Sequence, residues 1–119
     1  MDRIAIAELY ESQLKGIEKI QVQSVIPDAK NVRHIFPILT EKRNALKTYL
    51  DAKGIETLIH YEKPIHLHEA FTFLNYKKSD FPIAEKVCDT ELSLPIYPGM
   101  EAEEVIYVCD CVISFFSKN

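Results

Sequence analysis

Residues 33–62 have the sequence RHIFPILTEKRNALKTYLDAKGIETLIHYE, in which two apolar runs flank an amphipathic one. The first run, residues 33–40, and the last, residues 55–62, predict strands. The middle run predicts a helix with Thr40 as its N-cap and Gly54 as its C-terminal stop. Apolar side chains recur at helical spacing along its inner face, at Ala45, Leu46, Tyr49 and Leu50. Strand, helix and strand therefore form the central unit of the predicted fold.

Pro37 constrains the place of the first of these strands. Proline has no N–H to donate to a neighbouring strand. We therefore expect the strand at an edge of its sheet, or with Pro37 facing away from its neighbour.

The other predicted elements lie on both sides of this unit. Before it we expect a helix from Asp2 that frays near Gly16 to Lys19, and a short strand at 20–26. After it we expect a short helix or turn at 67–74, a helix from Ser79 or Asp80 with Pro82 in its first turn, and a third strand at 92–98. The last element is a helix at 100–119, whose apolar face holds Val105, Val108, Cys109, Val112 and Phe116. The expected fold class is α+β, with a small, mainly antiparallel sheet of about three strands packed with about four helices. Residues 1–119 are expected to form one domain.

Composition excludes several classes of protein. The chain has 119 residues, a net charge of -4 and a pI near 5.5, whereas nucleic acids and anionic membranes attract positive surfaces. No apolar run approaches the roughly 18 residues of a membrane span. The first residues are charged from Asp2 onward, so we expect no signal peptide. The three cysteines, Cys88, Cys109 and Cys111, have no disulfide-framework spacing, which predicts buried reduced thiols and a cytoplasmic protein.

Three of the four histidines, His60, His66 and His68, lie within ten residues. This cluster is open to three interpretations: a metal site, a catalytic site, or one part of a larger pocket. Their spacing matches no familiar zinc pattern, so a metal site is not favoured. Cys88 is a second candidate for catalysis, but its neighbours do not indicate an activated thiol. The glycines are isolated from one another, which excludes a glycine-rich phosphate loop.

The order of these segments resembles a known family. The features are a strand marked by a histidine, His34, then a helix, then KGIETLIHYEKPIH at 53–66, and later FPIAE at 81–85 and LSLPIYP at 92–98. Together they resemble the C-terminal small domain of the DegT/DnrJ/StrS sugar aminotransferases, which are pyridoxal-phosphate enzymes of the aspartate-aminotransferase fold. The resemblance covers nearly the whole chain.

The resemblance also implies what these residues do not include. A family member is much longer, and its large domain supplies the lysine that binds pyridoxal phosphate, an aspartate for the pyridine nitrogen and the phosphate-binding groups. This chain begins at the small domain. Because amino transfer requires such a lysine, we expect no cofactor and no transaminase activity from this chain alone.

The resemblance assigns substrate-binding roles to a few residues. The histidine-tyrosine turn of the family faces the active-site cleft, and His60 and Tyr61 match it. His66 matches the histidine that follows in the family motif, whereas no role carries over to His68. His60 is expected to offer a hydrogen bond to a sugar hydroxyl or to a phosphate.

Two functions follow as hypotheses. In the first, the chain is the small-domain part of a nucleotide-sugar aminotransferase of cell-surface polysaccharide or deoxyaminosugar biosynthesis, silent alone and completed by a separate large-domain chain. In the second, it is a stand-alone binding or assembly module that binds a nucleotide-sugar weakly or forms a homodimer. An independent enzyme that uses the histidine cluster is the least favoured alternative.

Overall fold

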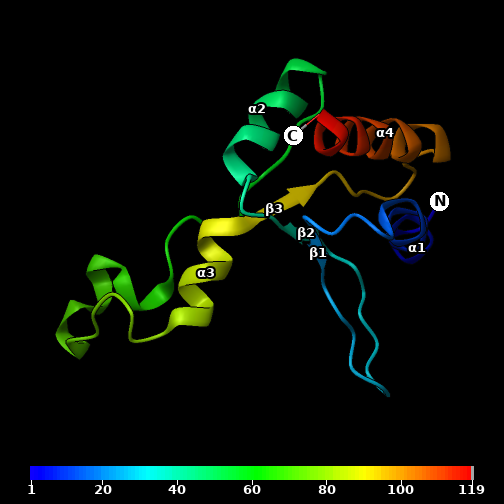
Figure 1. Ribbon diagram of the computed structural model, residues 1–119. Coiled ribbons are helices and arrows are strands. Elements are labelled where there is room, and N and C mark those ends of the chain that lie inside the picture. The colour runs from blue at the N-terminus through cyan, green and yellow to red at the C-terminus, as the bar shows by residue number, and fades with distance from the viewer. Residues whose placement is uncertain (119) are drawn as a thin grey trace.

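Residues 1–118 are described by a computed structural model, in which four α-helices surround a three-stranded sheet (Figure 1). In chain order the elements are α1 (Arg3–Leu14), β1 (Gln21–Val22), β2 (Phe36–Leu39), α2 (Arg43–Ala52), the 3-10 helices η1 (Ile65–Leu67) and η2 (Glu69–Leu74), α3 (Pro82–Thr90), β3 (Glu91–Leu94) and α4 (Ala102–Lys118). Both strand pairs are antiparallel. The predicted α+β class is confirmed, and residue 119 of the predicted last helix lies outside the described residues.

The sheet order is β1-β2-β3, so the expected edge position of the proline-containing strand is wrong. Pro37 instead satisfies the second expectation, because it faces away from β3. Its partner Ser93 exchanges backbone hydrogen bonds of 2.7 and 3.2 Å with Leu58 on the other side. Pro37 therefore points toward β1, which ends at Val22 opposite Ile38. The missing N–H interrupts the ladder only where β1 has already ended.

The core lies where α1, α2 and α4 pack on the sheet. Its largest fully buried side chains include Tyr10, Phe36, Ile38, Leu46 and Leu92. The rings of Tyr10 and Phe36 stack with centroids 4.8 Å apart, and the Tyr10 hydroxyl donates to the Pro95 carbonyl at 2.7 Å. Each such aliphatic or aromatic side chain contributes about 1.5–3 kcal/mol by leaving water. This packing joins the N-terminal helix to β2 and β3.

The predicted starts of the first two helices have different outcomes. The helix predicted from Asp2 begins there, because the Asp2 carboxylate caps α1 by accepting from the Ala5 N–H at 2.8 Å. The prediction of Thr40 as the N-cap of α2 is wrong, because α2 begins only at Arg43. The Thr40 N–H donates to the Thr90 carbonyl at 3.0 Å, which continues the pairing of β2 with β3 into the residue before β3. Its hydroxyl accepts from the Lys42 N–H at 3.2 Å, in a turn before the helix.

Gly54 ends α2 as predicted. Its N–H donates to the Asp51 carbonyl, and the Ile55 N–H donates to the Leu50 carbonyl, both at 3.0 Å. This pair of bonds is the Schellman motif, which requires a left-handed residue after the helix. Gly54 has φ +77°. This left-handed conformation is unfavourable for residues that carry a Cβ, whereas glycine adopts it without strain.

The predicted strands are shorter in the structure. Of residues 20–26 only Gln21–Val22 pair, and of residues 55–62 only Leu58 makes a bridge, opposite Ser93. The third strand begins one residue earlier than expected and ends before Pro95, which has no N–H. Strand ends depend on the available partners, and periodicity within one segment does not reveal them.

The later helices agree more closely with the prediction. Residues 65–74 form the two 3-10 helices η1 and η2. α3 starts at Pro82 rather than at Ser79 or Asp80. On α4 the expected face is buried, except that Phe115 is more deeply buried than Phe116. In the described part of the chain no helix is long and apolar enough to cross a membrane.

Residues 61–81 extend beyond α3, away from the sheet (Figure 1). Glu85 of α3 fastens this segment. Its carboxylate accepts from the Ser79 N–H at 2.9 Å and from the Phe81 N–H at 3.3 Å, and lies 3.3 Å from His66 Nε2. The hydrogen bond from Ser79, followed by those from Phe81 and His66, lowers the pKa of Glu85 below its ordinary value of 4.5.

Replacing Gly54 with alanine tests the Schellman end of α2. No atom lies within 4 Å of an added Cβ, so the cost comes from the backbone conformation alone. We expect Gly54→Ala to lower the free energy of unfolding by about 1–2 kcal/mol, measured by urea denaturation. Gly54→Asn is the control and is expected to cost less, because asparagine tolerates this conformation. An alanine variant as stable as the wild type would contradict the assignment.

Replacing Glu85 with glutamine tests how the 61–81 segment is held. A lowered pKa in the folded state means that the ionised carboxylate stabilises the protein above the unfolded-state pKa. That contribution is lost as the pH falls through the folded-state pKa. We therefore expect Glu85→Gln to be less stable than wild type at pH 7 and to approach it on acidification below the ordinary value of 4.5. Thermal unfolding from pH 7 to 3 measures this. Glu8→Gln, which removes an exposed carboxylate of α1, controls for overall charge, and a difference independent of pH would refute the expectation.

Candidate functional site

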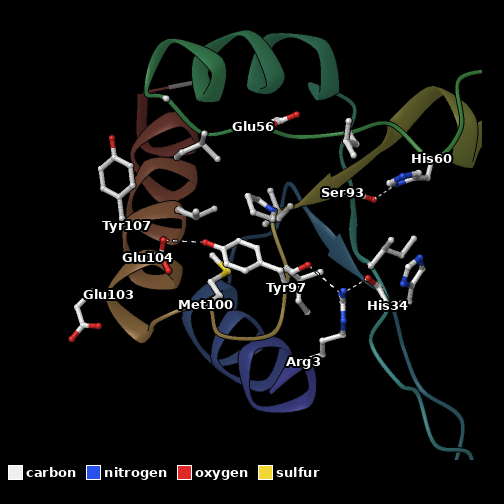
Figure 2. Close-up of a pocket in the computed structure, with 18 residues that line it drawn as sticks. Arg3, His34, Glu56, His60, Ser93, Tyr97, Met100, Glu103, Glu104 and Tyr107 are labelled. Carbon is white, nitrogen blue, oxygen red and sulfur yellow. Dashed lines mark hydrogen bonds between the residues drawn. The ribbon is translucent and has the colours of Figure 1, made fainter. Parts of the chain in front are cut away.

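A cavity of about 830 Å³ opens between the start of α1, the segment after α2, the exit of β3 and α4 (Figure 2). Its floor is apolar and includes Leu58, Leu94 and Met100. Segments far apart in sequence meet here because β3 lies between β2 and the bridge at Leu58. The cavity is large enough for a small-molecule ligand.

The polar lining of the cavity is mainly acidic. It contains the carboxylates of Glu56, Glu103 and Glu104 and the guanidinium of Arg3. The guanidinium is already engaged, because its Nη1 donates to the His34 carbonyl at 2.7 Å and to the Ile96 carbonyl at 3.1 Å. Arg3 thus ties α1 to the segments before β2 and after β3.

Tyr97 and Glu104 form a hydrogen-bonded pair across the cavity. The Tyr97 hydroxyl donates to Glu104 Oε1 at 3.0 Å (Figure 2). Glu104 Oε2 accepts from the Glu101 N–H at 2.8 Å. The bond from Glu101, and then that from Tyr97, lowers the pKa of Glu104, while the bond to Glu104 raises the pKa of Tyr97. The pair therefore stays in its ionised-acceptor and neutral-donor form near neutral pH.

His60 lies at one end of the cavity beside Ser93 (Figure 2). Its backbone N–H donates to Glu91 Oε2 at 2.6 Å, and its ring Nδ1 lies 2.8 Å from Ser93 Oγ. The Ser93 hydroxyl donates in turn to Glu91 Oε1. Glu91 is only 2% exposed. A buried carboxylate and a hydroxyl on β3 therefore hold both the backbone and the ring of His60.

The other sequence-predicted residues lie apart from this network. Tyr61 is 69% exposed, joined to His60 by a cis peptide bond, with its ring edge-on to that of His60 at 5.3 Å. His66 is buried against Phe81 and Glu85 and does not line the cavity. His68 Nε2 lies 3.1 Å from the Lys63 carbonyl. The histidine cluster in the sequence is thus divided among three environments.

This separation bears on the metal and nucleophile hypotheses. Among residues 1–118 no three histidine, cysteine, aspartate or glutamate side chains converge as a metal site would require. All three cysteines are free and buried. Burial raises the pKa of the Cys88 thiol, and raises that of Cys109 to about 12. Such thiols stay protonated and are poor nucleophiles.

Sequence reasoning missed Glu91 and Ser93. Their signal was present, because they are polar residues at alternate positions of the apolar segment ELSL, 91–94. Alternate strand residues point to the same face. Two polar side chains on one face of a buried strand indicate a shared polar partner, which is His60.

The chain matches known proteins over nearly its whole length. The model of the DegT/DnrJ/EryC1/StrS aminotransferase family matches residues 1–113. A dTDP-3-amino-3,4,6-trideoxy-alpha-D-glucose transaminase of Streptomyces venezuelae is 39% identical over 110 residues, which are 92% of this chain and 29% of that protein. A dTDP-3-amino-3,6-dideoxy-alpha-D-galactopyranose transaminase of Aneurinibacillus thermoaerophilus is 36% identical over 110 residues, 92% of this chain and 30% of that protein.

The fold agrees with these matches. The crystal structure of S. venezuelae DesV in complex with a ketimine intermediate superposes with a TM-score of 0.92 at 38% identity, covering 96% of this chain and 31% of that one. The chain thus spans about 30% of the length of these relatives. A family match over residues 1–113 and a shared fold place this chain in the DegT/DnrJ/EryC1/StrS aminotransferase family.

Proposed function

We propose that residues 1–119 are the small domain of a nucleotide-sugar aminotransferase and form one wall of its substrate cleft. The observation that carries the proposal is the superposition on DesV, in which this chain corresponds to 31% of that chain. Relatives with related names include the two dTDP-sugar transaminases and a spore coat polysaccharide biosynthesis protein of Bacillus subtilis. The process served is accordingly deoxyaminosugar or polysaccharide biosynthesis.

Within this proposal His60 is the substrate-facing residue. It lines the cavity, and its ring orientation is fixed by Ser93. Tyr61 extends into solvent next to it and supplies an exposed aromatic surface. His66 fastens the 61–81 segment through Glu85, and its contact with a substrate stays a prediction from the family motif.

The family uses pyridoxal phosphate, and a related Streptococcus pneumoniae sugar aminotransferase has been solved in its PLP form. The residues described here do not fit this cofactor. No lysine lines the cavity, and its one guanidinium, Arg3, is bonded to two backbone carbonyls. The acidic lining would also repel the cofactor phosphate. In this proposal residues 1–119 alone are therefore catalytically silent. The lysine that binds pyridoxal phosphate belongs to the large domain, either in the same polypeptide or in a separate one.

Incubation of the purified chain with pyridoxal phosphate, followed by borohydride reduction, tests this silence. We expect only sparse labelling spread over surface lysines, because no cavity lysine is available to form the imine. Mass spectrometry of peptides locates the label, and a complete family aminotransferase treated in parallel is the positive control. A stoichiometric adduct on one lysine would show that the chain holds the cofactor and would refute the proposal.

A second candidate function is supported by an exposed apolar surface. Segment 61–83 exposes large apolar side chains outside the main hydrophobic core, namely Tyr61, Ile65, Phe71, Phe73, Leu74, Tyr76, Phe81 and Ile83. Exposed apolar clusters usually mark association surfaces. In the small-domain proposal another part of the enzyme covers this surface. In the alternative, a stand-alone assembly module, a second copy of the chain covers it as a homodimer.

Sedimentation over a range of protein concentrations separates the two functions. The small-domain proposal predicts open-ended, concentration-dependent association, because the surface lacks its proper partner. It also predicts that Phe73→Ser with Ile83→Ser, at side chains 73% and 80% exposed, abolishes this association. Ile4→Ser, at an exposed apolar position on α1, is the control and should change nothing. A stable dimer of defined mass would instead favour the assembly module.

A further inference from the structure

His60, Ser93 and Glu91 form a hydrogen-bond chain whose direction can be worked out by counting protons. Glu91 Oε2 accepts from the backbone N–H of His60, which can only donate. Glu91 Oε1 accepts the hydroxyl proton of Ser93. Both carboxylate oxygens thus act as acceptors, as an ionised carboxylate requires. The Arg43 guanidinium donates to the backbone carbonyl of Glu91 at 3.0 Å and so holds the start of β3.

The direction of the Ser93 bond fixes the tautomer of His60. A serine hydroxyl has one proton, and Ser93 gives it to Glu91. The 2.8 Å contact between Ser93 Oγ and His60 Nδ1 can then be a hydrogen bond only if Nδ1 carries the proton. In a neutral imidazole with a proton on Nδ1, Nε2 is unprotonated and accepts hydrogen bonds.

The Nε2 atom is open to a ligand. Among residues 1–118 it has no hydrogen-bond partner, and no buried side-chain nitrogen or oxygen there lacks one, so Nε2 reaches solvent. His60 shares its cavity with the carboxylates of Glu56, Glu103 and Glu104, which are also acceptors. The donor in the lining that carries a fixed charge, Arg3, is already bonded to two carbonyls.

From this geometry we infer that Glu91 and Ser93 are positioning residues that place the proton of the neutral His60 ring on Nδ1 and leave Nε2 as a hydrogen-bond acceptor. The ligand partner of the neutral ring is accordingly a donor, a hydroxyl or amino group of a sugar, and not a phosphate. This narrows the earlier expectation that His60 binds either a hydroxyl or a phosphate. The identity of the ligand as a nucleotide-sugar rests on the proposed function, whereas the tautomer does not.

Long-range 1H–15N correlation spectra of the chain labelled with 15N-histidine measure the tautomer directly. They are recorded near pH 8.5, about two units above the ordinary histidine pKa, and His60→Gln assigns the signals. We expect the Nδ1–H form of His60 in the wild type. Its presence can be established without cofactor, substrate or activity.

Glu91→Gln is the decisive variant because glutamine has the shape of glutamate but reverses the direction of the hydrogen bonds from residue 91 through Ser93 to His60. The backbone N–H of His60 still requires an acceptor, so the glutamine oxygen takes that place and its NH2 faces Ser93. Ser93 must then donate to Nδ1, and the proton moves to Nε2. We expect the Nε2–H form in Glu91→Gln, loss of the Nδ1–H preference in Ser93→Ala, and its retention in Ser93→Thr, which keeps the hydroxyl.

Two outcomes would overturn the inference. One is an Nε2–H tautomer in the wild type, which would mean that Glu91 is protonated and donates. The other is a folded Glu91→Gln variant, with dispersed amide signals, whose His60 tautomer is unchanged. Inorganic sulfate, which can only accept hydrogen bonds, is the ligand probe: it should leave the wild-type Nε2 signal in place, and a saturable shift would contradict a donor-specific site. A pyridoxal-phosphate adduct on one lysine, or a stable dimer in sedimentation, would count against the proposed function and leave the tautomer result intact.

Discussion

The buried guanidinium of Arg43 joins α2 to the junction of α3 with β3, and the candidate site depends on this connection. It donates to the Cys88 carbonyl at 3.1 Å and to the Glu91 carbonyl at 3.0 Å, at the point where α3 becomes β3. These carbonyls would otherwise be left without partners at a helix end, and a positive charge is favoured there. The start of α2 is thereby fixed to the start of β3.

The site follows from this junction. Once Glu91 is held, β3 places Ser93 two residues further along on the same face, and its backbone bonds bring Leu58 alongside. Two residues after Leu58, His60 then lies within hydrogen-bond distance of the Glu91 and Ser93 side chains. A residue in an irregular segment is thus given a defined ring orientation by a regular strand. The sheet thereby orients a candidate-site residue that is not itself part of the sheet.

The helices were largely predictable because their signals are local. Asp2 caps α1 with its own carboxylate, and Gly54 ends α2 with its own conformation. The strands were less predictable because their ends depend on partners. Thr40 has the chemistry of an N-cap, but its N–H is bonded to Thr90, so the helix starts later. Pro37 lies in a central strand because it faces the side where β1 has ended, which no local pattern indicates.

The candidate site shows the same division. The sequence by itself determined the α+β class, the presence and order of the four α-helices, and the buried cysteines, because these follow from periodicity and from burial preference, and it indicated His60 as a candidate through a family motif. Only the tertiary structure decided that His60, His66 and His68 lie in separate environments, and that Glu91 and Ser93 hold His60. The physical reason is that a hydrogen bond depends on distances in space. Glu91 and His60 are 31 residues apart in the chain and 2.6 Å apart in the fold.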